Sequence, residues 1–254
     1  MHLIENGKSV WENYETLGGI IDTVIQDLVA RKAENKKVIE VCHVGKFLML
    51  LGGDNSIEQV MEQPDFIVKT NVGKVGVEHQ VIIDTSSKEK EGFFENIFSI
   101  AETELQSDID LPNFLANCYM RPYLTYSIAD KARYVEEVKR VVKQYILTGK
   151  MEEDSIIDRI SSMPHSARSL SVNFGAWWQK PITEELILDA VNQKEKKLIN
   201  YVKNTGLPIW LLLVIGSLKE SSFEVDKVMD IHLQTQFQRV FLLEDFSARL
   251  WILK

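Results

Sequence analysis

The sequence predicts an α/β (α+β) fold in which a mixed central β-sheet is flanked by helices. Three observations support this. Amphipathic stretches with apolar residues at three- and four-residue steps alternate with short β-rich stretches. Residues 209–215 are continuously apolar, which is typical of a strand buried on both faces. Strands expected as hairpins stand on both sides of a helical middle region, and this order favours a layered architecture around a single core.

The composition is that of an ordinary globular chain. The 254 residues include 29 basic and 37 acidic side chains, the net charge is −8, and 45% of residues are hydrophobic. These values exclude a disordered chain and argue against a protein that coats nucleic acid by bulk charge. No apolar run can span a bilayer and no signal peptide is recognised, so we expect a cytoplasmic protein without membrane contact. Cys42 and Cys118 are expected to be reduced core thiols.

The N-terminal part is expected to contain one helix and two hairpins. Residues 10–31 place apolar side chains at helical spacing. Residues 38–43 and 47–51 are apolar and β-rich, so they are expected to pair as a first hairpin. A second hairpin should join strands 65–69 and 75–83 through a short polar turn that contains glycine.

The middle and C-terminal parts complete the predicted core. Thr183 is the expected N-cap of the third long helix, and a glycine and a proline end that helix. We expect one domain over residues 1–254, with a core of about 9–90 and 181–254 and a mostly helical insertion of about 91–180. The remaining expected elements are helices 90–106, 128–147 and 183–204, strands 113–120, 209–215, 239–243 and 249–253, and an irregular or β-containing stretch at 155–178.

The most informative stretch for function is the second hairpin. It begins with Pro64-Asp65, and its second strand contains Glu78-His79-Gln80. Because side chains alternate along a strand, Glu78 and Gln80 share one face and His79 takes the other. The hairpin can also bring Asp65 close to Glu78. Two carboxylates on rigid strands are suitable ligands for Mg²⁺, and a metal-activated water can attack a phosphodiester.

This hairpin resembles the active-site hairpin of the PD-(D/E)xK nuclease superfamily (restriction-endonuclease-like), in a Glu-x-Gln variant. The resemblance implies a restriction-endonuclease-like core and a nuclease that hydrolyses DNA or RNA with Mg²⁺ or Mn²⁺. Asp65, Glu78 and the main-chain carbonyl of His79 would bind the metal. Gln80 stands where the family usually has lysine, and it would orient water or phosphate.

The helix expected at 183–204 resembles the Gln-x-x-x-Tyr helix of one branch of that superfamily, because it contains Lys197-x-x-x-Tyr201. Lys197 would supply the missing cation, and Lys194, nearly on the same face, is the reserve candidate. The superfamily also often places a glutamate on its first helix. Glu15 is preferred there, because Glu12 has an alternative role in helix capping.

The resemblance also implies partners. Nucleic acid is the expected partner, and it would approach residues 120–204, where fourteen basic side chains outnumber eleven acidic ones. Such folds often form dimers, so a homodimer is one expected assembly. The same fold without catalysis, serving as a degenerate interaction or structural module, is the alternative function.

Simpler interpretations exist for several of these residues. Pro64-Asp65 is also common as a plain strand-entry turn, and His79 is more simply a packed histidine than a ligand. Trp177-Trp178 is expected in the core rather than as a platform for bases. Glu78 is different, because an acid between apolar strand residues needs a partner or a metal.

Overall fold

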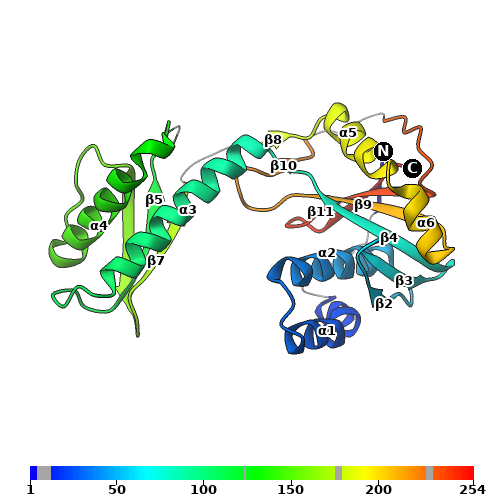
Figure 1. The fold of residues 1–254 in the computed structure, drawn as a ribbon, viewed down its shortest axis with the longest axis horizontal. Coiled ribbons are helices and arrows are strands. Elements are labelled where there is room, and N and C mark those ends of the chain that lie inside the picture. Colours follow the sequence, from blue (N-terminus) through cyan, green and yellow to red (C-terminus); the bar gives the residue numbers. More distant parts are fainter. Residues whose placement is uncertain (5–12, 123, 175–178, 227–230) are drawn as a thin grey trace. The chain divides into compact units, whose positions relative to one another are not determined.

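The computed structural model describes residues 1–4, 13–122, 124–174, 179–226 and 231–254. The chain divides into two compact units (Figure 1). Unit 1 contains Met1–Ile83 and Lys180–Lys254, and unit 2 contains Asp84–Gln179. Unit 2 corresponds closely to the stretch 91–180 that the sequence set apart as an insertion.

Unit 1 is built on a mixed seven-stranded sheet with the order β1-β12-β11-β9-β4-β3-β2. Strand β9 pairs in parallel with β4 and with β11, and the other neighbours are antiparallel. All seven residues of β9 are buried, as its continuous apolar sequence predicted. The expected mixed central sheet is thus confirmed. Its strands are β1 (His2–Ile4), β2 (Ser56–Val60), β3 (Phe66–Thr70), β4 (Gly73–Val81), β9 (Ile209–Ile215), β11 (Arg239–Glu244) and β12 (Arg249–Ile252).

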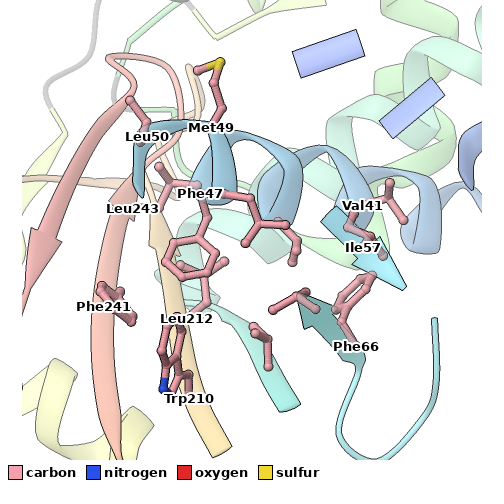
Figure 2. Packing of buried hydrophobic residues seen from close by; sticks show 14 of the residues in the cluster. Val41, Phe47, Met49, Leu50, Ile57, Phe66, Trp210, Leu212, Phe241 and Leu243 are labelled. Atoms are coloured by element: carbon pink, nitrogen blue, oxygen red, sulfur yellow. The ribbon is translucent and has the colours of Figure 1, made fainter. Parts of the chain in front are cut away.

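Helices cover both faces of this sheet. On one face lie α1 (Tyr14–Ala30) and α2 (Asn35–Leu51), and Figure 2 shows Phe47 of α2 against Trp210 and Phe241 of the sheet. On the other face lie α5 (Glu184–Glu195) and α6 (Leu198–Thr205). The strands β8 (Lys180–Pro181) and β10 (Phe223–Glu224) form a separate, two-stranded parallel sheet in unit 1. The sheet is therefore buried on both sides.

The first hairpin expected at 38–43 and 47–51 is wrong, because this whole stretch forms α2. Its β-rich residues also satisfy helical spacing, since Val41, Val44 and Leu48 are all fully buried on the sheet-facing side. Packing overrides strand propensity here. Gly45 contributes to this, because a Cβ at that position would lie 2.1 Å from Ile21 Cγ2 of α1.

Two other boundaries differ from expectation. The helix expected at 183–204 is broken into α5 and α6 at Lys196 and Lys197. The expected first helix begins at Tyr14 in the described part of the chain, and Glu12 lies outside the described residues.

Unit 2 packs two helices on a three-stranded sheet with the order β6-β5-β7. The helices and one face of the sheet share a single apolar core. The insertion is thus an α+β unit rather than a mostly helical one, and Trp177-Trp178 lie outside the described residues. The elements are α3 (Thr85–Leu105), β5 (Phe114–Met120), a 3₁₀ turn (Ile128–Asp130), α4 (Lys131–Thr148), β6 (Ile157–Pro164) and β7 (Ser169–Asn173). None of the helices in the described ranges has the length and apolar character needed to cross a bilayer.

Candidate metal centre

Asp65 lies at the point where β3 begins. Pairing between β3 and β4 starts with Phe66 opposite Val77, so Asp65 stands beside the part of β4 that β3 does not cover. Its Oδ2 accepts a hydrogen bond from the backbone N–H of His79 at 2.9 Å. Pro64 packs over Gly76, where a Cβ would come within 2.9 Å of Pro64 Cγ. These contacts fix Asp65 against β4, so Pro64-Asp65 is more than a plain turn.

Glu78 lies on the face of β4 that is covered by α5 and α6, and its side chain is almost fully buried. Its Oε1 accepts hydrogen bonds from Lys194 Nζ at 2.5 Å and from Tyr201 Oη at 2.8 Å. Its Oε2 is buried and has no hydrogen-bond partner among the described residues. One oxygen of Glu78 is therefore fully engaged and the other is available to a ligand.

Gln80 lies two residues further along the same face of β4. Its Oε1 is also buried, and no side chain or backbone group in the described ranges bonds to it. A buried amide oxygen without a partner carries a desolvation cost that a ligand would remove. Glu78 and Gln80 thus share one face, as strand alternation predicted.

The cation beside Glu78 is Lys194 and not Lys197, so the preferred assignment is corrected. Lys197 is exposed and forms the N-cap of α6. The break between α5 and α6 separates Lys197 from the face that holds Lys194 and Tyr201, which both reach Glu78. The sequence missed this because it predicted one continuous helix.

Glu15 is exposed in the first turn of α1, and the helical glutamate close to the hairpin is Glu40 of α2. Lys37 joins Glu40 to the site, since its Nζ lies 2.7 Å from Glu40 Oε2 and 3.7 Å from Asp65 Oδ1. Sequence reasoning missed both residues because it assigned this segment to a strand. The signal was the spacing of Lys37 and Glu40, which places them on one face of a helix.

The electrostatics of the site reflect two crowded carboxylates. Burial, and then the negative charge of Glu78, raise the pKa of Asp65 to about 6, against the lowering influence of the His79 N–H and of nearby lysines. Burial and the hydrogen bond to Glu78 raise the pKa of the Tyr201 hydroxyl. The Lys37 pKa is raised, because its carboxylate neighbours, Glu40 foremost, outweigh the lowering effect of burial. Burial and the nearby Glu78 carboxylate therefore disfavour the charged form of Asp65.

The imidazole of His79 points away from Glu78, to the face covered by α2. Its Nε2 lies 3.0 Å from Nδ1 of His43, and the two rings are stacked. Burial, and then His43, lower the pKa of His79 to about 3, and burial lowers the pKa of His43. Both rings are therefore neutral at neutral pH, and His79 is the packed histidine of the simpler interpretation.

The main chain of His79 has a different orientation. Gly76 N–H and Ile82 N–H both bond to carbonyls of the β9 side, so the even-numbered residues of this part of β4 turn their backbone groups toward β9. His79 is odd-numbered, so its N–H and C=O point to the other edge of β4, toward Asp65. Its carbonyl is thus at the same edge as the Asp65 carboxylate.

The oxygen donors of this site suit a hard divalent cation. They are the Asp65 carboxylate, Glu78 Oε2, Gln80 Oε1 and the His79 carbonyl, and Mg²⁺ takes such oxygens together with water. Only two of these donors are carboxylates. This agrees with the finding that, over the described ranges, no group of three or more His, Cys, Asp or Glu is arranged to hold a metal ion. The fit therefore depends on the amide and main-chain oxygens.

A groove of about 1230 Å³ lies on the α1–α2 side of unit 1 and includes Asp65 in its lining. Residues of α1, α2 and β2 form most of its walls, with Lys37 and Glu40 among them. Six acidic and three basic side chains line the groove. Its walls therefore carry excess negative charge, which disfavours the approach of a phosphate to Asp65 from this side in the absence of a cation.

Comparisons with known proteins add no assignment. No protein-family model, no curated protein and no solved structure matches this chain. The roles of these residues must therefore be argued from their geometry and chemistry.

Proposed function

We propose that unit 1 is a metal-dependent nuclease that hydrolyses phosphodiester bonds of DNA or RNA. The observation that carries the proposal is the state of Glu78. One of its oxygens is held by Lys194 and Tyr201, and the other is buried without a partner among the described residues, close to a second carboxylate of raised pKa. A carboxylate prepared in this way is typical of a metal ligand.

Asp65, Glu78 Oε2, Gln80 Oε1 and the His79 carbonyl would hold Mg²⁺ or Mn²⁺. When bound, the ion would supply a Lewis acid and lower the pKa of a water. It would also neutralise the two carboxylates, which the surrounding lysines do only in part. Glu40, on the helix next to the hairpin, takes the place that the resemblance gave to Glu15.

The chain's own residues account for the remaining roles. Tyr201 orients Glu78 by donating to Oε1, so that Oε2 faces the site. Lys194 brings an ammonium to the carboxylates, and this group would stabilise charge that develops on the phosphate. The β3–β4 hairpin, α5 with α6, and β9 support a restriction-endonuclease-like core, since these are among the elements on which the resemblance rests.

A titration with Mn²⁺ tests this assignment. Wild type should bind Mn²⁺, Glu78→Gln should bind it at least tenfold more weakly, and Glu15→Gln should behave as wild type. Glu15 is the matched control, because it is a glutamate of the same unit that is exposed and lies on α1. Hydrolysis of labelled DNA and RNA with Mg²⁺ should follow the same order. Equal Mn²⁺ binding by wild type and Glu78→Gln would refute the metal site.

One observation favours the alternative of a degenerate interaction module. Lys194 lies 2.5 Å from Glu78 and already provides it with a cation. In that case the Lys194–Glu78 pair is purely structural and neither carboxylate binds metal. The same titration separates the two functions, because only the nuclease requires Mn²⁺ binding that depends on Glu78.

A further inference from the structure

Unit 2 presents a sheet surface that its own helices do not cover. The even-numbered residues of β5 are buried in the core formed with α3 and α4. Strand alternation therefore turns the odd-numbered residues to the other side, which we call the distal face. The distal face consists of Leu115, Asn117 and Tyr119 of β5, Arg159, Ser161 and Met163 of β6, and Ser169, Ser171 and Asn173 of β7.

The register of the sheet arranges these side chains in rows. Tyr119 lies between Arg159 and Asn173, and the guanidinium of Arg159 stands 3.9 Å from the centre of the Tyr119 ring. The next row places Asn117 between two serines. The side chains from β6 are exposed, and those from β5 are half-buried. The surface thus combines a stacked aromatic–cation pair with hydroxyl and amide groups.

We propose that the distal face binds single-stranded nucleic acid through its unpaired bases. The flat guanidinium on Tyr119 offers a base a stacking surface. The neighbouring asparagines and serines offer both donors and acceptors to base edges. Arg159 is the one basic residue of the distal face, and the exposed Asp158 follows Ile157 at the register shift beside it. Recognition therefore depends on stacking and hydrogen bonds rather than on phosphate contacts.

The same composition is poorly suited to a protein partner. The centre of a protein interface is usually apolar and aromatic and contains few serines. Here the apolar side chains, Leu115 and Met163, lie opposite each other at one end of the face, and the centre is polar. A base, which is flat and carries donors and acceptors at its edge, matches the centre better.

The test is fluorescence anisotropy with the full chain and short labelled oligothymidylate and RNA strands in EDTA, so that no hydrolysis occurs. Tyr119→Ala and Arg159→Ala should each weaken binding at least about fivefold, the lower bound for loss of one stacked base. Tyr119→Phe should retain binding. Arg133→Ala is the matched control, because Arg133 forms a similar pair with Tyr134 on α4, at 4.4 Å. This control should bind like wild type.

Three further results decide the proposal. A duplex should bind more weakly than a single strand, and the logarithm of affinity should fall with the logarithm of salt no more steeply than about −0.7, as expected for one phosphate contact. Because binding is measured in EDTA, without the metal that the nuclease proposal requires, the two proposals can fail or succeed independently. Equal affinity of wild type and of a folded Tyr119→Ala, confirmed by circular dichroism, would overturn it and leave a protein as occupant. A steep salt dependence would also overturn it.

Discussion

Removal of the ammonium beside Glu78 is the most direct perturbation of the site. Lys194→Met leaves a nearly fully buried carboxylate whose remaining hydrogen-bond partner among the described residues is Tyr201. Loss of one partner from a fully buried ion pair costs about 3–5 kcal/mol. The Lys194 side chain is 22% exposed and the tyrosine bond remains, so we expect a loss of about 2 kcal/mol. Lys197→Met should change stability by less than about 0.5 kcal/mol, because that side chain is exposed.

The assay is urea denaturation at pH 7.5, with and without Mn²⁺. If the site binds metal, Lys194→Met should bind Mn²⁺ more tightly than wild type, because a competing positive charge has gone, and Mn²⁺ should restore much of its stability. Its hydrolytic activity should nevertheless fall, since the cation that faces the phosphate is missing. The reasoning is refuted if Lys194→Met and Lys197→Met lose equal stability, or if Mn²⁺ weakens rather than stabilises the Lys194 variant.

Three other predictions concern the surroundings of the site. Asp65 has a folded pKa of about 6, above its ordinary value of 3.8, so its contribution favours the folded state at low pH and is lost as pH rises from about 4 to about 6. Urea midpoints across this window should therefore decline less with pH in Asp65→Asn than in wild type, and an identical profile would contradict the assignment. His43 and His79 act in the opposite sense, because their lowered pKa values favour the folded state above about 6.5, and this contribution is lost as pH falls. Nitrogen chemical shifts should show the His79 ring neutral at pH 6, and an imidazolium there would count against the stacked pair. Gly45→Ala should cost about 1–3 kcal/mol by forcing a Cβ into α1, whereas Gly19→Ala, with open space at its Cβ, should stabilise by up to about 1 kcal/mol; equal thermal midpoints would disprove the close contact.

The elements that the sequence predicted well are those with one strong local signal. Strand β9 has the predicted bounds because a continuous apolar run that begins directly after Gly206-Leu207-Pro208 admits little else. The β3–β4 hairpin follows from its turn, and alternation correctly placed Glu78 and Gln80 on one face. The local sequence pattern was therefore enough to predict the positions of the candidate site residues that lie on strands.

The parts that sequence reasoning missed depend on tertiary contacts. The sequence of α2 resembles two strands because it includes β-branched and aromatic residues such as Val41, Val44 and Phe47, and only packing against the sheet selects the helix. Because that helix was not predicted, Glu40 and Lys37 were not recognised as residues near the site. The choice between Lys194 and Lys197 depended on a helix break that charge spacing alone does not reveal.

The position of unit 2 in the chain has a consequence for how the centre is assembled. Asp65 and Glu78 belong to one hairpin, a local structure that can form early, while Lys194 is 116 residues beyond Glu78 and follows all of unit 2. The two acids and Lys37 can thus be present before Lys194, the cation that bonds to Glu78, has been synthesised. Until the last third of the chain is made, a dissolved divalent ion could serve as a temporary counterion of Glu78.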